Sequence, residues 1–269
     1  MTVSLARLLL PPAARGGRGA PHLIERNLLA ARNAWLTFVS GFVEPVFYLL
    51  AIDIGLGALV GDVTGPGGQP LSYAAFAAPA LLAASAMNGA VYESTFNIFF
   101  RLRYGKLYDA MLATPLSPVD IAVGEIGWSQ LRGLGYACAF MVVMGALGLI
   151  ASPWAVLAVP AAILLGFAFG AVGMAAVTFM RSWVDLDLVN LALLPLFLFS
   201  ATFYPLEVYP RALQLLTNLS PLYHGVVVIR SLTLGVVHPG LLGHVAFLVV
   251  MAIIGSVVAA RRLHRQLAP

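Results

Sequence analysis

The chain has 269 residues, of which 61% are hydrophobic and only 10% charged, and its mean hydropathy is +0.93. A soluble globular domain averages about half apolar and a quarter charged residues, so this composition excludes that class and indicates an integral membrane protein. The net charge of +4 is spread over short basic segments, which favours a topology signal over nucleic-acid binding. The single cysteine, Cys138, excludes a disulfide framework and a Cys/His zinc motif within the chain.

Residues 1–34 are expected to form a cytoplasmic N-terminal segment. The apolar run from Leu8 to Leu10 is too short for a signal-peptide core and ends at two prolines. Residues 22–33 place Leu23 and Leu28 on one side and charged residues elsewhere, which predicts an amphipathic helix lying at the inner membrane interface. The alternative is that this segment is the frayed start of the first membrane span.

Six apolar stretches are long enough to be transmembrane helices, because a hydrocarbon core about 30 Å thick needs roughly 20 helical residues. They cover approximately Trp35–Leu59, Tyr73–Phe99, Ile121–Ile150, Trp154–Met180, Leu186–Phe203 and Leu241–Ala260. Apolar runs that do not alternate in polarity argue against a β-barrel. We therefore expect an all-α membrane domain over residues 35–260, followed by a cytoplasmic tail at 261–269.

The distribution of basic residues predicts the orientation. Twelve of the fifteen fall on one side of the expected spans, only Arg211 and Arg230 fall on the other, and Arg132 lies within the third span. Basic residues in short loops mark the cytoplasmic side. Both termini of this multi-pass protein are therefore expected in the cytoplasm.

Two segments are expected on the outer side. Residues 60–70 are rich in glycine and proline and read as a turn-forming loop. Residues 204–240 contain four prolines, yet are too apolar for a solvated loop. Because their helical pieces are too short to span the bilayer, they predict a re-entrant helical hairpin, with a surface loop packed on the bundle as the alternative.

Polar residues inside the expected spans are few, and a charge at the bilayer centre costs about 2.5 to 3.5 kcal/mol on insertion scales. Glu44 precedes Pro45 in the first span, and Glu93 and Asn97 lie one turn apart in the second. Glu125 and Arg132 share a face of the third span, so Glu93 and Arg132 can pair between neighbouring helices. Each of these residues either holds the helices together or lines a substrate path.

A glycine face in the fourth span, formed by Gly166, Gly170 and Gly173, allows close helix approach. It can serve packing within the subunit or an interface between subunits. The sequence contains no phosphate-binding loop, no nucleophile elbow and no HExxH zinc motif, so we assign no catalytic residue and no metal ligand.

Several segments resemble the permease subunits of ABC-2 type exporters, most closely the branch that includes the nodulation-factor (lipo-oligosaccharide) export permease and, beyond it, drug-export permeases of the same family. The matching segments follow one another in order over most of residues 25–262. They are Glu44-Pro45 with Leu49 to Gly57, Tyr92 to Phe96, Tyr108 to Leu116, Ser200 to Leu206 and Ser220 to Gly225.

The resemblance implies a dimer of six-helix subunits, of the same or homologous chains, each seated on a separate cytoplasmic ATP-binding subunit. ATP and Mg²⁺ would then bind to that partner, and this chain would hold no cofactor. The loop between the second and third spans would supply the coupling helix, at about residues 105–114. Apolar residues there can fill a groove of the partner while charged residues set the register; the expected contacts are Arg103, Lys106, Leu107, Asp109, Met111 and Leu112.

The expected function is therefore a permease in the bacterial cytoplasmic membrane, surrounded by lipid, that moves an amphiphile outward. Lipid-linked glycans, lipo-oligosaccharides and lipids are the favoured cargoes, with a hydrophobic drug as the alternative. Two more distant readings are a polytopic membrane enzyme and an ion-coupled transporter, in which Glu44 would carry the proton.

Overall fold

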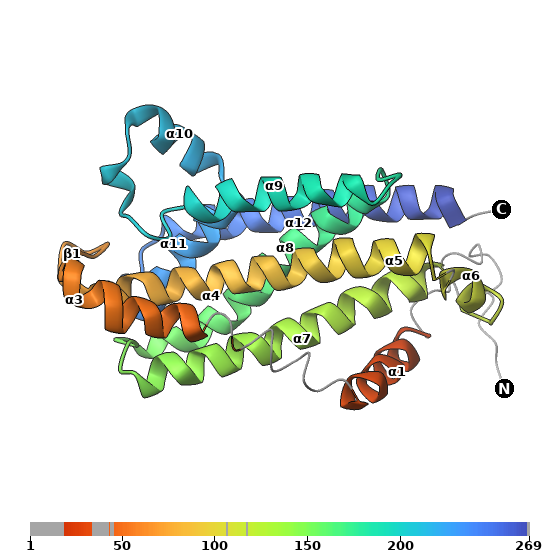
Figure 1. Ribbon diagram of the computed structural model, residues 1–269, viewed down its shortest axis with the longest axis horizontal. Coiled ribbons are helices and arrows are strands. Elements are labelled where there is room, and N and C mark those ends of the chain that lie inside the picture. The colour runs from red at the N-terminus through yellow and green to blue at the C-terminus, as the bar shows by residue number, and fades with distance from the viewer. Residues whose placement is uncertain (1–18, 34–42, 44–45, 106, 117, 268–269) are drawn as a thin grey trace.

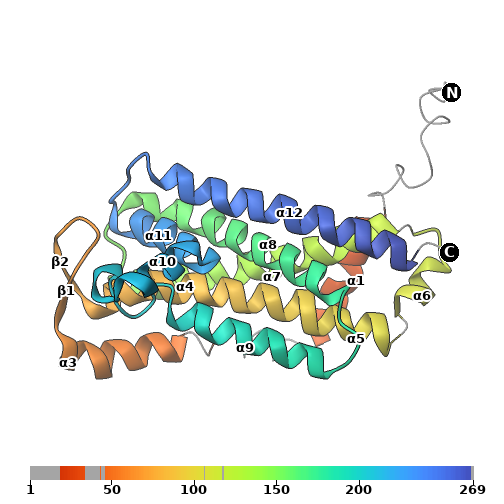
Figure 2. The same cartoon turned by 90° about the horizontal axis from the view of Figure 1, so that it is seen from above.

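The computed structural model describes residues 19–33, 43, 46–105, 107–116 and 118–267. These residues form an elongated and mostly helical bundle, whose long helices α4, α7, α8, α9 and α12 run lengthwise (Figure 1). The same packing is seen from above in Figure 2. The expectation of an essentially all-helical fold is thus confirmed.

The helices differ widely in length. In chain order they are α1 (Ala20–Asn33), the π-helix η3 (Ile52–Leu56), α3 (Gly57–Val60), α4 (Tyr73–Tyr92), the π-helix η4 (Glu93–Asn97), α5 (Ile98–Arg103), α6 (Leu107–Leu112), α7 (Pro118–Ala146), the 3-10 helix η5 (Pro153–Leu157), α8 (Ala158–Val177), α9 (Val184–Leu198), the 3-10 helix η6 (Leu206–Val208), α10 (Arg211–Leu219), α11 (Pro221–Leu234) and α12 (Leu241–Leu267).

Three segments within the described residues are long and apolar enough to cross a membrane, namely Tyr73–Arg101, Pro153–Val177 and Leu241–Arg262. A fourth is reached if the bent pair α10 and α11 is taken as one span. Helix α7 has 29 residues but carries charged side chains, and α9 has only 15 residues. Much of the expected first span, with Glu44, lies outside the described residues, so the count of six spans stays a prediction.

Helix α8 lies at the centre of the bundle and contacts α4, α7, α11 and α12. A Cβ atom at Gly166 would lie 3.5 Å from the Ala86 carbonyl oxygen of α4, and one at Gly173 would collide with the Ser94 hydroxyl of η4. On the α12 side, a Cβ at Gly255 would come within 2.8 Å of the Val172 backbone nitrogen. The glycine face of the fourth span therefore serves close packing within the subunit.

A short β-hairpin follows α3, where the sequence predicts only a turn-forming loop. Strands β1 (Asp62–Thr64) and β2 (Pro70–Ser72) pair antiparallel, with Val63 opposite Leu71. Gly68 has a φ of 77°, a left-handed conformation that favours glycine, and it closes the turn between the strands. Strands of three residues carry too little alternating pattern to be recognised from sequence.

Helices α10 and α11 meet at an angle of 85° around Ser220, and Pro221 occupies the first turn of α11. Helix α11 is largely buried against α4, α8 and α12, whereas Leu215, Leu216 and Leu219 of α10 are exposed. Helix α10 stands away from the bundle in Figure 1. The sequence predicts short helical pieces here, which the structure contains, whereas a re-entrant hairpin on the outer side stays a prediction.

The two ends of the molecule differ in charge. Helices α1 and α6 and the C-terminal end of α12 lie at one end, and the β-hairpin and α10 lie at the other (Figures 1 and 2). Arg26, Arg101 and Arg262 belong to elements at the first end. We call this end the basic end; it is the one that the sequence predicts to face the cytoplasm.

Candidate functional site

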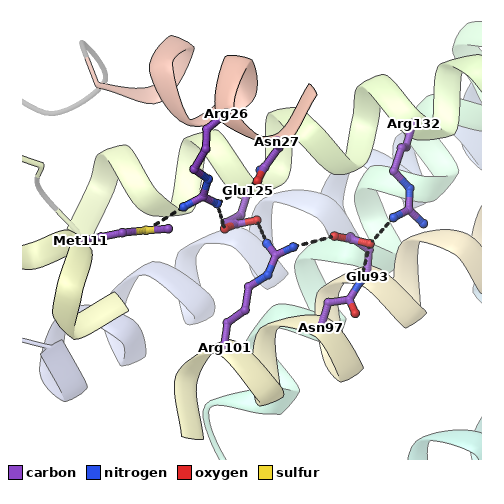
Figure 3. A network of polar contacts seen from close by, with 8 residues as sticks. All are labelled: Arg26, Asn27, Glu93, Asn97, Arg101, Met111, Glu125 and Arg132. Carbon is purple, nitrogen blue, oxygen red and sulfur yellow. Dashed lines mark hydrogen bonds and ion pairs between the residues drawn. The ribbon is translucent and has the colours of Figure 1, made fainter. Parts of the chain in front are cut away.

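The polar side chains near the basic end form one network that joins α1, η4, α5 and α7 (Figure 3). Arg132 on α7 donates to the Glu93 carboxylate on η4 over 2.7 Å, which is the pair that the sequence suggests. Asn97 donates its amide to the same Glu93 oxygen over 2.6 Å. Glu93 and Asn97 therefore share a face, as their spacing in the sequence predicts, and Glu93 joins its own helix to the neighbouring α7.

Arg101 connects the two carboxylates of the network. Its guanidinium donates to Glu125 on α7 and also lies 3.8 Å from Glu93. The sequence treats Arg101 only as a cytoplasmic loop cation, and the structure instead places it on α5, three-quarters buried beside the membrane carboxylates. One arginine that reaches two acids can transfer between them when the helices shift.

The third arginine enters the network from helix α1. Arg26 on α1 lies 3.8 Å from Glu125 and donates to Asn27 over 2.8 Å and to the Met111 sulfur over 3.7 Å. Helix α1 packs along α7, and Leu23 is buried there. The location of α1 at the membrane interface stays a prediction, but the contact with Met111 joins α6 directly to the network.

The network combines two carboxylates with three guanidinium groups. Glu93 and Glu125 are each 4% exposed, whereas Arg26, at the edge of the network, is 40% exposed. An unpaired buried charge is strongly unfavourable, and removing one partner of a buried pair typically costs about 3 to 5 kcal/mol. The paired arrangement therefore explains how five charged side chains remain inside or beside the apolar bundle.

The π-helical turn η4 sets the position of Glu93. Within it Ser94 and Thr95 both donate to the Val91 carbonyl, over 3.2 Å and 2.6 Å, and their side chains pack against Gly173 of α8. A π-turn contains one more residue than an α-turn and often accompanies a functional site. It lets Ser94 and Thr95 face α8 while Glu93 and Asn97 face α7.

Two small cavities flank the network. One of about 20 Å³ is lined by Glu93, Arg132 and Tyr136, and one of about 10 Å³ by Glu93 and Glu125. A cavity needs roughly 10 to 15 Å³ to hold a water molecule. The network therefore has room for single waters but not for a cargo, and its chemistry is ion pairing between helices.

The expected coupling residues are only partly placed. Leu107, Asp109, Met111 and Leu112 lie on α6, Arg103 ends α5, and Lys106 lies outside the described residues. Met111 is only 6% exposed and packs with Phe99, Ile121 and Leu23. This burial differs from the expected groove-filling role, because a side chain inside its own subunit anchors the helix and cannot also enter a partner.

Arg230 is a further buried cation, and the sequence predicts it only as a basic residue on the outer side. Arg230 on α11 is 5% exposed and donates to the carbonyls of Phe76 over 3.0 Å and Ala201 over 2.9 Å. Its guanidinium also lies 3.8 Å from the centre of the Phe76 ring. No salt bridge joins Arg230 to an acidic side chain among the described residues. The signal that could have exposed it is an arginine within the apolar run of α11.

Comparison with known proteins gives consistent relatives. Residues 22–234 match the family model described as ABC-2 type transporter. Nodulation protein J of Sinorhizobium fredii (strain NBRC 101917 / NGR234) is 31% identical over 246 residues, which cover 90% of this chain and 92% of that protein. Nodulation protein J of Rhizobium meliloti (strain 1021) is 31% identical over 251 residues, with 91% and 92% covered. The resemblance found in the sequence motifs is confirmed over nearly the whole length.

Proposed function

The chain belongs to the ABC-2 type transporter family, and we propose that it is the permease subunit of an exporter in the bacterial cytoplasmic membrane. Its cargo is an amphiphile, namely a lipid-linked glycan, a lipo-oligosaccharide or a lipid, which moves outward. A separate subunit binds and hydrolyses ATP with Mg²⁺, and a second permease subunit completes the path. The observation that carries this proposal is the family match over residues 22–234.

Helix α6 is the element that receives motion from the ATP-binding subunit. It lies at the basic end, outside the long helices (Figure 1). Ala110 on this helix is exposed. Met111 ties the same helix to the buried cluster and to Arg26. A push on α6 therefore reaches the charged network through packed side chains.

The network converts that push into a choice between two arrangements. Helix α5 follows directly after η4, and its Arg101 contacts both Glu125 and Glu93. A rotation of α5 strengthens one of these contacts at the expense of the other, which moves α7 relative to α4. A two-state element of this kind is what a switch between inward-accessible and outward-releasing forms requires.

The test is a charge placed on the exposed face of α6. We expect Ala110→Arg to leave insertion and folding intact but to reduce cargo-stimulated ATP hydrolysis by about ten-fold or more in the reconstituted complex, since a buried interfacial charge costs several kcal/mol. The matched control is Ala151→Arg, which changes another exposed alanine in the loop before η5 and should have no effect. The readouts are co-purification of the ATP-binding subunit and ATPase rate; equal rates in the two variants contradict the assignment of α6.

A further inference from the structure

Two grooves flank helix α9 where it lies over α4 and η4. The larger has a volume of about 580 Å³, and Val91, Phe169, Val172, Ala192 and Leu196 are among its mainly apolar lining residues. It extends to Arg181 and Asp185 at the N-terminal end of α9. Small-molecule sites usually have about 300 to 1,000 Å³ and mainly apolar walls, so this groove is the right size for a long hydrocarbon chain.

The smaller groove, on the other flank of α9, has a different lining. Its volume is about 300 Å³, and Asn88, Tyr92, Phe96, Asn190 and Phe197 line it. The rings of Tyr92 and Phe96 are stacked, with centroids 4.8 Å apart and an angle of 15° between their planes. This groove therefore offers two amides beside an aromatic surface.

Leu193 lines both grooves and separates them. No pair of elements that includes α9 makes extensive contact within the described residues, so α9 is held against the bundle less closely than α8 or α11. A molecule with two chemically different halves can therefore lie across α9 around Leu193, with one half on each flank.

The two amides of the smaller groove are available for a ligand. Asn88 and Asn190 are both exposed, and no hydrogen bond links either side chain to another described residue. A carboxamide has two donor hydrogens and an oxygen acceptor. Polar side chains within membrane helices usually find a partner on another helix or line a wet path, since leaving them in hydrocarbon is unfavourable.

We propose that the two grooves form one bipartite site for a glycolipid, with its acyl chain in the larger groove and its sugar head in the smaller. The hydroxyl and amide groups of the head hydrogen-bond to Asn88 and Asn190, and the apolar face of a sugar ring packs on Tyr92 and Phe96. This site rests on the proposed export function and deepens it, because it selects a glycan-bearing cargo over a hydrophobic drug. A drug needs no paired amides.

Photolabelling of the purified transporter complex in nanodiscs tests the site without ATP turnover. The probe is hexadecyl maltoside with a diazirine in its alkyl chain, and the second arm uses a phosphatidylcholine with the same diazirine in a palmitoyl chain. Ala192→Trp fills the larger groove and Asn190→Leu removes an amide from the smaller one. The matched control for the first variant is Leu191→Trp, since Leu191 is 68% exposed and lines neither groove.

We expect the maltoside to label peptides of α8 and α9, and each groove variant to lower that labelling by about five-fold, as the loss of one hydrogen bond or of a fitted chain implies. Leu191→Trp should label as the unchanged chain does. Equal labelling by the phospholipid overturns the site in favour of general lipid contact, and no effect of either groove variant overturns the bipartite arrangement. A changed oligomeric state of Asn190→Leu by light scattering overturns it in favour of a subunit interface. If labelling behaves as expected while Ala110→Arg leaves ATPase coupling intact, only the coupling assignment fails.

Discussion

The molecule buries arginine side chains in two ways at its two ends. Near the basic end, Arg101 and Arg132 are neutralised by Glu93 and Glu125. Towards the other end, Arg230 is held by backbone carbonyls of α4 and of the segment after α9, and by the face of an aromatic ring. Both arrangements supply hydrogen-bond acceptors to a guanidinium, but only the first contains partners that can be exchanged.

The two arrangements differ in whether the helices that they join can move relative to each other. Arg101 has two acids within 4 Å, so small helix rotations change its partner without leaving it uncompensated. Arg230 fastens α11 to Phe76 and Ala201, whose carbonyls cannot follow it if α11 moves. We therefore expect α11 to move as one body with α4, while α5 and α7 shift relative to each other.

The largest effect is expected from Arg230→Ala. The change removes several hydrogen bonds from a charged donor, each worth about 1.5 to 3 kcal/mol, so we expect a loss of about 4 kcal/mol in the free energy of unfolding. For a chain of this size the midpoint of thermal unfolding in detergent should fall by about 8 to 16 °C. Arg211→Ala, an exposed arginine on α10, is the control and should leave the midpoint nearly unchanged. A fall no larger than that of the control would mean that Arg230 is not a fastening point.

A smaller stability effect and a larger functional one are expected from Glu93→Gln. The glutamine keeps the size of the side chain and can still accept from Asn97, but Arg132 loses its paired charge. We expect a loss of about 2 to 3 kcal/mol, because Arg132 is partly exposed and can turn towards water. Cargo-stimulated ATP hydrolysis should fall more than the folded fraction does.

A double-mutant cycle with Arg132→Gln sharpens this result. Two residues in direct contact typically couple by about 0.5 to 3 kcal/mol, so the double variant should be more stable than the sum of the two single effects predicts. Additive effects would show that the pair over 2.7 Å carries no energy of its own. In that case Arg132 and Arg230 would differ only in where they lie in the fold.

The smallest effect is expected from Arg26→Gln. Arg26 is 40% exposed and lies 3.8 Å from Glu125, so solvent and salt screen the interaction. Exposed pairs contribute about 0 to 1 kcal/mol, and we expect a loss within that range that shrinks at high ionic strength. Denaturation at two salt concentrations measures it. A loss comparable to that of Glu93→Gln would show that the contact between Arg26 on α1 and Glu125 belongs to the buried part of the network.

The sequence predicts the part of the network that joins the second and third expected spans. The shared face of Glu93 and Asn97 follows from helical periodicity, and the opposite charges of Glu93 and Arg132 on consecutive spans suggest that they pair. Arg101 is missed because positive charges next to a span usually mark its cytoplasmic end, and nothing in the sequence shows that this one turns back towards Glu125. The contact from Arg26 depends on how α1 packs on α7, which periodicity does not determine.

The region of α10 and α11 shows the same limit of sequence-based prediction. Prolines and apolar residues predict the bent helices α10 and α11, since they determine helix breaks and burial locally. The burial of Arg230 depends instead on carbonyls from residues about 30 and 150 positions away in the chain. The grooves beside α9 also cannot be predicted from the sequence, because a groove is the space that separate helices leave unfilled when they pack.

The π-turn η4 has an evolutionary consequence. Such a turn differs from a regular helix by one inserted residue, and each residue of an α-helix rotates the chain by about 100°. The wider π-turn absorbs the extra residue over its own length, so deleting one residue between Glu93 and Asn97 would restore a regular helix and leave Arg101 close to its present side of that helix. The same deletion within α4 would swing η4 and everything up to α6 around the helix axis. The chain length between α4 and α6 can thus change by one residue at η4 with little effect on where α6 lies, so single insertions and deletions should be tolerated better here than elsewhere along α4.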